Sequence, residues 1–286
     1  MIISDILERA EVLGLGNYME QLRTSAIKAV LFRTKPVSSL ELLPIGNSRL
    51  GGTPDIPEDF TWPLWLNRPL DFIAQINLAA VAQIGGIPSL PKSGSFLFFY
   101  DSAQQAWGSD PHERGSCKVC FIEPQTSLGR AGDFSDAKEE KYTACALSCE
   151  LLWTLPSPFS KEVSHFGFNE PETEIYCRLF EEVMRSPDRS TQTYMFGHPD
   201  IIQGDMSGDL SLVAKSLQKG SVSGHTKAHR RRDNDKGKEW NLLLQVSSEN
   251  DAKMEWGDQG CLYFWVPDNE QGTPDVSAAW AILQSH

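Results

Sequence analysis

The sequence predicts an α+β protein, mostly antiparallel β, with two internally duplicated β-rich halves related by pseudo-symmetry behind a short N-terminal helical segment. Three observations support this class. Short apolar runs are separated by Gly, Pro and Asp, as strands joined by turns are. Strands and helices do not alternate regularly, as a parallel sheet would require. A set of similar segments occurs twice in the same order, approximately over residues 40–123 and 190–284.

The composition is that of a globular protein without a membrane span. The 286 residues are 40% hydrophobic and 22% charged, which suits a single domain over residues 1–286. The formal net charge of −12 disfavours broad binding to nucleic acid or to anionic lipid. No apolar run approaches the roughly 20 residues that a bilayer requires, and the N-terminus has no signal-peptide pattern. We therefore expect a cytoplasmic protein with reduced cysteines and no membrane partner.

The N-terminal helical segment is predicted over residues 4–26. Ser4 can cap a first helix, whose apolar residues Ile6, Ala10 and Leu13 recur at helical spacing. Gly14 ends this helix, and a second short helix can begin at Asn17.

Strands are predicted over most of the remaining chain. Their segments are IKAVLFR, SLELLPI, DFIAQIN, GSFLFFYD, CKVCFIE, ACALSCELLWTLP, WNLLLQVS, GCLYFWV and AWAILQ. One helix interrupts them after Asn169, which can cap it, with Pro171 in the first turn and an apolar stripe of Ile175, Leu179 and Val183.

The duplication rests on matched positions within the two sets of segments. Each set contains a Gly-x-Pro-Asp turn, then a strand with a central Gln, then a strand that follows a Gly. The pairs are Gly52/Gly197, Pro54/Pro199, Asp55/Asp200, Gln75/Gln245 and Gly94/Gly260. The shared order makes chance an unsatisfactory explanation.

The second half contains extra length between its turn and its glutamine strand. A flexible basic insertion is predicted over residues 215–238, where no apolar periodicity is found. Residues 227–238 carry six Lys/Arg against two Asp. They form either a solvated insertion or a docking patch for phosphate, RNA or an acidic partner, the only place where nucleic acid is a candidate.

The segments that repeat also resemble a known family. SRLGGTPDIPEDFTWP, PLDFIAQINL and SGSFLFFYD, with GHPDIIQGDM, WNLLLQVSSENDAKMEWGDQGCLYFWV and AWAILQ, are similar to the YwqG-like family of bacterial proteins over roughly residues 25–284. The family is a domain of unknown function. The resemblance implies a soluble α+β protein and supplies no catalytic residue and no cofactor.

The duplicated turns supply the candidates for catalysis. Asp55, Asp200, His198 and Asp205, together with Asp59, could bind Mg²⁺ or Ca²⁺ or act as acid and base. Alternatively, an Asp in such a turn accepts backbone N–H bonds and serves the fold. His198 is special because Thr53 takes its place in the first half.

Polar residues in two apolar strands supply the candidates for ligand binding, namely Gln75, Asn77, Gln245 and Ser247. Strand alternation puts Phe72, Ala74 and Ile76 on one face and Gln75 on the other. Each Gln either bonds the backbone of the Pro-Asp turn or lines a polar cleft between the halves.

The cysteine spacing is a weaker signal. Cys117-x2-Cys120 and Cys145-x3-Cys149 resemble paired zinc ligands. In a strand, however, Cys117 and Cys120 would point to opposite faces, so we assign no metal to them.

Two functions remain as hypotheses. The first is a binding or interaction protein with a protein or small-molecule partner in a cleft between the halves. The alternative is a metal-dependent hydrolase that uses the Pro-Asp turns. Signatures of phosphate loops, zinc proteases, serine hydrolases and kinases do not occur in the sequence.

Overall fold

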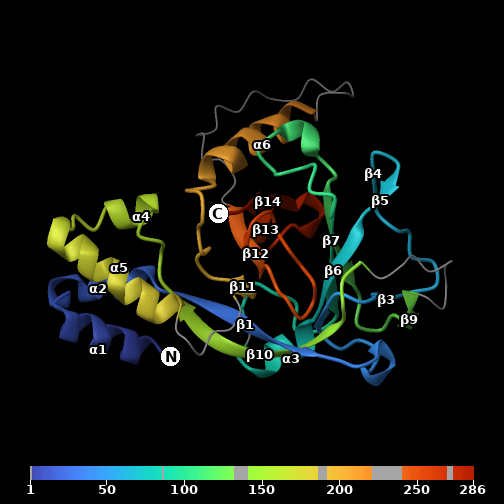
Figure 1. Ribbon diagram of the computed structural model, residues 1–286, viewed down its shortest axis with the longest axis horizontal. Helices are drawn as coiled ribbons and strands as arrows, with labels where there is room; N and C mark the ends of the chain where they lie inside the picture. The colour runs from blue at the N-terminus through green and yellow to red at the C-terminus, as the bar shows by residue number, and fades with distance from the viewer. Residues whose placement is uncertain (1, 86, 132–140, 186–191, 221–239, 269–272) are drawn as a thin grey trace.

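The computed structural model describes residues 2–85, 87–131, 141–185, 192–220, 240–268 and 273–286. Its centre is a ten-stranded antiparallel sheet in the order β14-β13-β12-β11-β1-β10-β2-β6-β7-β8 (Figure 1). The strands are β1 (Ile27–Pro36), β2 (Arg49–Leu50), β6 (Asp71–Asn77), β7 (Ser95–Tyr100), β8 (Cys117–Ile122), β10 (Cys145–Thr154), β11 (Tyr194–Phe196), β12 (Trp240–Ser247), β13 (Cys261–Pro267) and β14 (Trp280–Gln284). The mixed helix and strand class and its antiparallel sheet agree with the sequence-based prediction.

The prediction of a strand in SLELLPI is wrong. Leu40–Leu42 form a short 3₁₀-helix, because the Ser39 side chain accepts a hydrogen bond from the Glu41 N–H and closes a turn instead. Two small pairs lie outside the main sheet: β3 (Asp55–Ile56) pairs with β9 (Gly129–Arg130), and β4 (Leu64–Trp65) pairs with β5 (Arg68–Pro69).

Two long strands join the halves at the middle of the sheet. β1 and β10 pair antiparallel over their whole lengths, from Ile27 opposite Thr154 to Pro36 opposite Cys145. β1 precedes the first half in the chain but pairs with β11 of the second, while β10 precedes the second half and pairs with β2 of the first. The antiparallel pair of β1 and β10 therefore joins the two groups of strands into one sheet.

The strands flanking this central pair form two corresponding sets. The first half contains β2, β6, β7 and β8, and the second contains β11, β12, β13 and β14. Gln75 of β6 lies opposite Leu97, and Gln245 of β12 lies opposite Tyr263. The register shifts two residues before each glutamine, at Ile73 and at Leu243. The two sets therefore agree in order, direction and irregularity.

The shift in β6 corrects the predicted faces of that strand. An extra residue in a strand displaces the alternation. Ile73, Ala74 and Ile76 therefore all face the core inside the sheet, and Phe72 lies in a separate cluster on the outside. The prediction that placed Phe72 with Ala74 and Ile76 is wrong for this reason.

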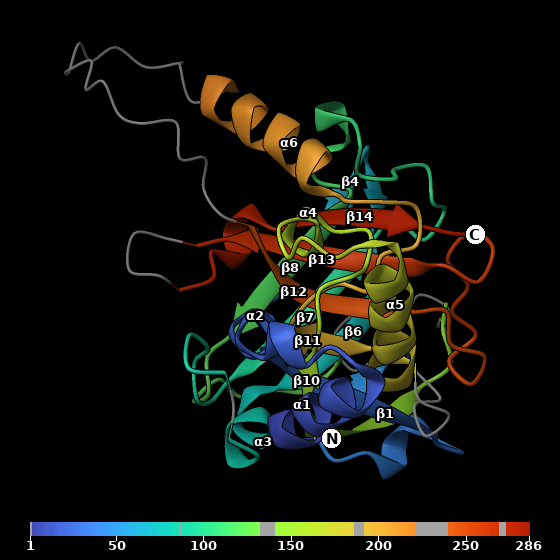
Figure 2. The ribbon, with the colours of Figure 1, turned by 90° about the vertical axis from the view of Figure 1, so that its left-hand side faces the viewer.

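The sheet curls until its edge strands β8 and β14 approach each other (Figure 2). A loop of residues 101–116, which we name the crossing loop, leaves β7 and reaches β14. The Leu283 N–H donates to the Trp107 carbonyl at 3.0 Å, and the Trp280 indole N–H donates to the Gly108 carbonyl at 2.8 Å. Inside the curl, the rings of Phe98 and Phe264 meet with centroids 5.1 Å apart. The two halves therefore share one core.

Helices cover the outer face of the second half (Figure 2). They are α1 (Ile3–Leu13), α2 (Met19–Ser25), α4 (Lys161–Ser164) and α5 (Glu170–Met184). Asn169 caps α5 as predicted, by accepting from the Glu172 N–H at 2.9 Å. Ser4 does not cap α1, which begins one residue earlier and has Ile2 at its N-cap.

Three of the helices were not predicted, the short α4 and also α3 (Leu78–Gln83) and α6 (Ser207–Gly220). α6 includes residues 215–220, so the first part of the predicted basic insertion is helical. The remainder of that insertion, with the basic stretch 227–238, lies outside the described residues.

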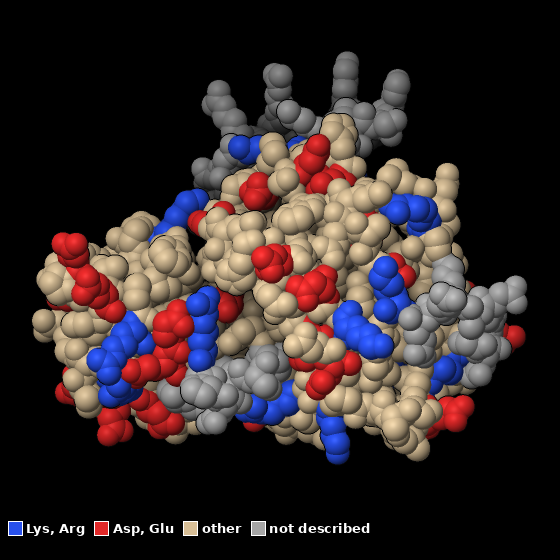
Figure 3. Space-filling view, viewed as in Figure 1, with Lys and Arg blue, Asp and Glu red and all other residues tan. Residues whose placement is uncertain are grey.

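Charged side chains of both signs are mixed on the face in Figure 3, where Lys and Arg lie among Asp and Glu. Ion pairs among the described residues include Arg9 with Glu182 at 2.5 Å and Arg33 with Glu150 at 2.7 Å. None of the helices in the described ranges combines the length and the apolar character that a membrane span requires.

Candidate functional site

The first Pro-Asp turn places Asp55 in the interior of the protein. Gly52 has a φ of +67°, and a Cβ on it would lie 2.9 Å from that of Ala144, so the turn needs glycine here. The Asp55 side chain is fully buried. Its carboxylate accepts from the Gly46 N–H at 2.7 Å and from the Gln75 amide at 2.8 Å.

Two arginines neutralise this buried carboxylate. Arg49 Nη1 lies 2.8 Å from Asp55 Oδ2, and Arg130 Nη1 lies 2.7 Å from Oδ1. Burial by itself raises the pKa of the Asp55 carboxyl, but the contact with Arg49 and the hydrogen bonds from Gln75 and Gly46 outweigh it and hold that pKa below its ordinary value. Asp55 is therefore an ionised group whose oxygens are occupied by protein donors.

The second Pro-Asp turn repeats the backbone geometry but not the charges. Gly197 has a φ of +78°, and its Cβ would lie 2.8 Å from that of Ala29. Asp200 pairs with Arg185 at 3.0 Å, and Arg185 is 41% exposed where Arg49 is fully buried. The Tyr263 hydroxyl donates to the Asp200 carbonyl. Only the first turn therefore contains a buried ion cluster.

The two glutamines make the same bond in each half. Gln75 Oε1 accepts from the Asp55 N–H at 2.8 Å, and Gln245 Oε1 accepts from the Asp200 N–H at 3.0 Å. Their amides donate to carbonyls of Asn47 and Gln192. Of the two alternatives for these residues, the structure contains the bond to the backbone of the Pro-Asp turn.

The other two ligand candidates also bond within the fold. Asn77 caps α3 by accepting from Ala79 and Ala80 N–H groups, and its amide donates to the Gly46 carbonyl at 2.8 Å. Ser247 Oγ accepts from the Gln192 N–H at 3.2 Å.

His198 and Asp205 lie in separate surroundings. The His198 ring is nine-tenths buried, with Nε2 2.6 Å from the Ser25 carbonyl and Nδ1 3.8 Å from Glu162. Asp205 accepts from the Ser207 N–H at 2.8 Å at the start of α6. Within the described ranges, no residue that bonds the Asp55 side chain also bonds that of Asp200, so each turn is held by its own set of partners.

The buried histidine gives the protein a pH-dependent stability. Burial lowers the pKa of His198 against the opposing effects of the Ser25 carbonyl and Glu162. The unfolded chain therefore binds the proton first as pH falls. We expect the free energy of unfolding to be fully maintained above about pH 6.5 and to fall below it by at most about 1.4 kcal/mol per pH unit. Urea unfolding between pH 8 and 5 measures this.

His198→Gln should remove that decline, since an amide can still donate to the Ser25 carbonyl but does not titrate. His165→Gln is the matched control, because His165 is exposed. Equal pH dependence in wild type and in His198→Gln would contradict the assignment of this decline to His198.

The cysteines of the weak zinc pattern are divided between faces of the sheet. Cys117 and Cys145 belong to the core inside the curl, while Cys120 packs in the outer cluster. Burial raises the pKa of the Cys117 thiol to about 12 and that of Cys145 to about 11, which keeps both protonated. Over the described ranges, no three His, Cys, Asp or Glu side chains gather as metal ligands would.

A cavity lies at one end of the curled sheet, between the two halves. Its volume is about 370 Å³, within the roughly 300–1,000 Å³ usual for ligand pockets. The first half contributes Pro88, Ser89, Leu90, Pro91, Phe96 and Phe121. The second half contributes Thr273, Pro274 and Val276.

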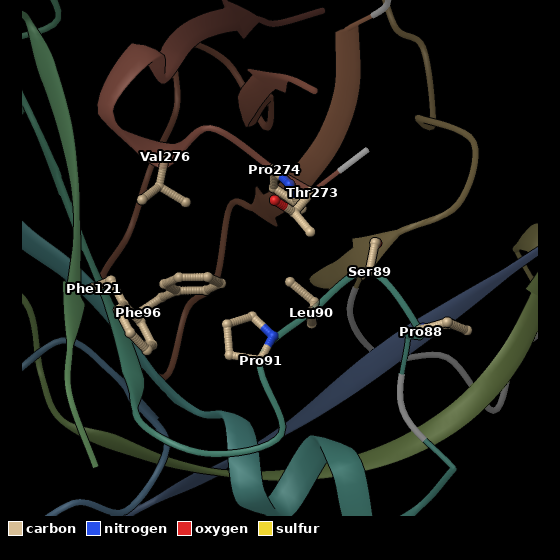
Figure 4. Close-up of a pocket in the computed structure, with 9 residues that line it drawn as sticks. All are labelled: Pro88, Ser89, Leu90, Pro91, Phe96, Phe121, Thr273, Pro274 and Val276. Carbon is tan, nitrogen blue, oxygen red and sulfur yellow. The ribbon is translucent and has the colours of Figure 1, made fainter. Parts of the chain in front are cut away.

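The side chains around this cavity converge on a common space (Figure 4). Val276 faces Phe96 and Phe121 across the opening, and Leu90 and Pro91 lie opposite Thr273 and Pro274 (Figure 4). The lining is apolar except for the hydroxyl groups of Ser89 and Thr273. An adjoining cavity of about 220 Å³ shares Pro88, Leu90 and Pro91 and extends to Lys92.

Sequence reasoning placed the cleft at the polar strand residues and missed these apolar ones. The available signal was the segment IPSLP a few residues before a strand, where two prolines lie close to Leu90 outside any regular element. Phe96 and Phe121 read as ordinary core residues, because strand alternation cannot tell a packed aromatic ring from one that borders a cavity.

Comparison with known proteins identifies a family whose function is not known. The family model described as "Domain of unknown function (DUF1963)" matches residues 48–284. No curated protein matches the sequence.

Proposed function

Because the chain belongs to the DUF1963 family, a domain of unknown function, we propose a role from its geometry: it is a binding protein whose ligand site is the cavity between its halves. The observation that carries this proposal is the construction of the cavity. Its walls come from segments about 150 residues or more apart in the chain, Leu90 and Phe121 on one side and Val276 on the other. The ligand is small and largely apolar.

The burial of the residues that line the cavity supports a site that is preformed in the absence of ligand. Phe96 is 2% exposed and Leu90 is 8% exposed, so the floor is part of the shared core. Phe121 packs edge-on against Phe96 with ring centroids 5.7 Å apart, which fixes both rings. A rigid apolar floor lowers the entropy cost of binding.

The hydrolase alternative stays a prediction. The Asp55, Asp200, His198 and Asp205 side chains all have partners that serve turns, a buried contact or a helix start. No contact among them favours catalysis over these roles.

We also infer that the two halves descend from one duplicated unit. The support is the matching strand order, the matching register shifts and the same Gln-to-Asp N–H bond in each half. We further propose that the protein is one of the YwqG-like proteins of bacteria and that it is located in the cytoplasm.

The proposal is tested with ligands on the wild-type protein and with a substitution at Val276, in the second half, that fills the cavity. We expect small apolar compounds, aliphatic and aromatic, to shift the methyl NMR signals of Leu90 and Val276 in the wild-type protein. Val276→Phe should weaken the binding by at least about tenfold, since its ring occupies the ligand's space. Val12→Phe is the matched control, because Val12 is 71% exposed on α1.

Binding that shifts these methyl signals in the wild type and is lost only in Val276→Phe supports the proposed function. If no compound at millimolar concentration shifts either signal, the proposal is wrong.

A further inference from the structure

Leu90, which borders the cavity, has a positional counterpart in the second half that carries a larger side chain. The correspondence of the halves allows the two positions to be compared residue by residue. Gly94 and Gly260 mark the same point, because the Leu78 N–H donates to the Gly94 carbonyl at 3.0 Å and the Ser248 N–H donates to the Gly260 carbonyl at 2.9 Å.

Four residues before each of these glycines, the halves differ. The first half has Leu90, which borders the 370 Å³ cavity, and the second half has Trp256. Trp256 is fully buried and is the largest such side chain in the described ranges. Its ring lies 6.0 Å from that of Tyr100 and 5.8 Å from that of Tyr142, measured between centroids.

The opposite walls correspond as well. Tyr100 ends β7, and Val266 takes the matching place in β13, just before the segment that contains Pro274 and Val276. In the second half, Trp256 packs against Tyr100 of the first half. In the first half, the smaller Leu90 borders the cavity, so the two halves differ at this position by the volume between a leucine and a tryptophan side chain.

We propose that the cavity binds a small molecule with a fused aromatic ring, which takes the place that the Trp256 indole takes in the second half. This rests on the proposed function and names the class of ligand for that site. A cavity of about 150 Å³ is enough for a benzene ring, so 370 Å³ can hold a bicyclic ring with a substituent. Phe96 and Phe121 offer the ring edges and faces that aromatic ligands prefer.

The exposed residues at the opening of the cavity indicate where the substituent of the ligand's ring lies. Pro91 and Thr273 are exposed, whereas Phe96 and Leu90 at the floor are buried. The ring therefore enters toward Phe96, and a polar group remains beside the Ser89 and Thr273 hydroxyls, where water also reaches it.

The experiment compares two probes of equal size on the whole chain. Indole and n-octanol have the same number of non-hydrogen atoms, and calorimetry with methyl NMR measures both. We expect indole to bind at least about tenfold more tightly than n-octanol and to shift the Leu90 and Val276 signals. Leu90→Trp should abolish indole binding, and Leu90→Met, which keeps the volume, should retain it.

Each of the other possible outcomes would contradict a stated part of the proposal. If n-octanol binds as tightly as indole, the aromatic assignment is wrong while the binding function stands. If neither binds, both fail. If a tryptophan-containing peptide binds more tightly than indole at the same methyl groups, the occupant is a protein side chain and the small-molecule assignment is wrong. The comparison of probes uses the wild-type chain, so it holds even where Leu90→Trp does not fold.

Discussion

Asp55→Asn is expected to lower the free energy of unfolding by about 3–5 kcal/mol, because it leaves the buried Arg49 guanidinium without its counter-charge. Arg130 would lose the same partner. Arg49 cannot turn to water easily, since it is fully buried and also donates to the Thr53 carbonyl, and Arg130 is only 15% exposed and donates to the Leu43 carbonyl. Urea unfolding at pH 7 measures the loss.

The corresponding change in the second half is the matched control. Asp200→Asn should cost only about 1 kcal/mol, because its partner Arg185 is 41% exposed and can be solvated. Similar losses in the two variants would show that the first turn owes nothing to its buried charges. The sequence alone predicts equal roles for the two aspartates, so the difference tests the structure specifically.

The contribution of the buried Asp55 carboxylate to stability has a defined dependence on pH. The pKa of Asp55 is lowered in the folded state, so its contribution is present above the unfolded value of about 3.9 and is lost as pH falls below it. The gap between wild type and Asp55→Asn should therefore be constant from pH 7 to about pH 4 and narrow in stronger acid.

Gly108→Ala is expected to destabilise the protein by about 2–4 kcal/mol by opening the contact between the crossing loop and β14. A Cβ at Gly108 would lie 2.1 Å from the Ala281 carbonyl oxygen, and the φ of +88° disfavours any side chain. The nearest atoms that this Cβ would meet all belong to the backbone of Ala281 and Ile282, so relief requires the loop and the strand to separate. Denaturant unfolding measures the loss.

Gly208→Ala is the control for this substitution. Nothing lies within 4 Å of the position of its Cβ, and it stands in the first turn of α6. We expect no loss and up to about 1 kcal/mol of stabilisation, since alanine restricts the unfolded chain. A Gly108→Ala protein as stable as wild type would show that the crossing loop does not hold the sheet closed.

Much of the secondary structure was accessible from the sequence because its signals are local. Apolar runs bounded by Gly and Pro identify the long strands, and Asn169 with Pro171 identifies the start of α5. The segment at residues 39–45 was misassigned because a Ser39 side-chain bond competes with the strand. The register shift beside Gln75 was also missed, since an extra residue in a strand leaves no mark in the pattern of apolar residues.

For the candidate site, by contrast, less could be predicted from the sequence than for the secondary structure. The bond from Gln75 to the Asp55 turn could be anticipated, because a buried amide in an apolar strand needs a partner and the same arrangement recurs at Gln245. The arginines around Asp55 could not, since Arg130 comes from a strand 75 residues later in the chain. Nor could the cavity, which depends on how Leu90 and Phe96 of the first half meet Val276 of the second across the fold.

The sequence by itself determined the class of fold, the positions of most strands and the turns that need Gly52 and Gly197, whereas the duplication of the halves stays a prediction. These follow from hydrophobic pattern and backbone sterics, which act between residues close in the chain. Only the tertiary structure decided that β1 pairs with β11 and β10 with β2, that Asp55 is buried between two arginines while Asp200 pairs with a partly exposed one, and that a cavity lies beside Leu90. Packing, burial and desolvation depend on which distant segments meet, and that is a property of the assembled chain.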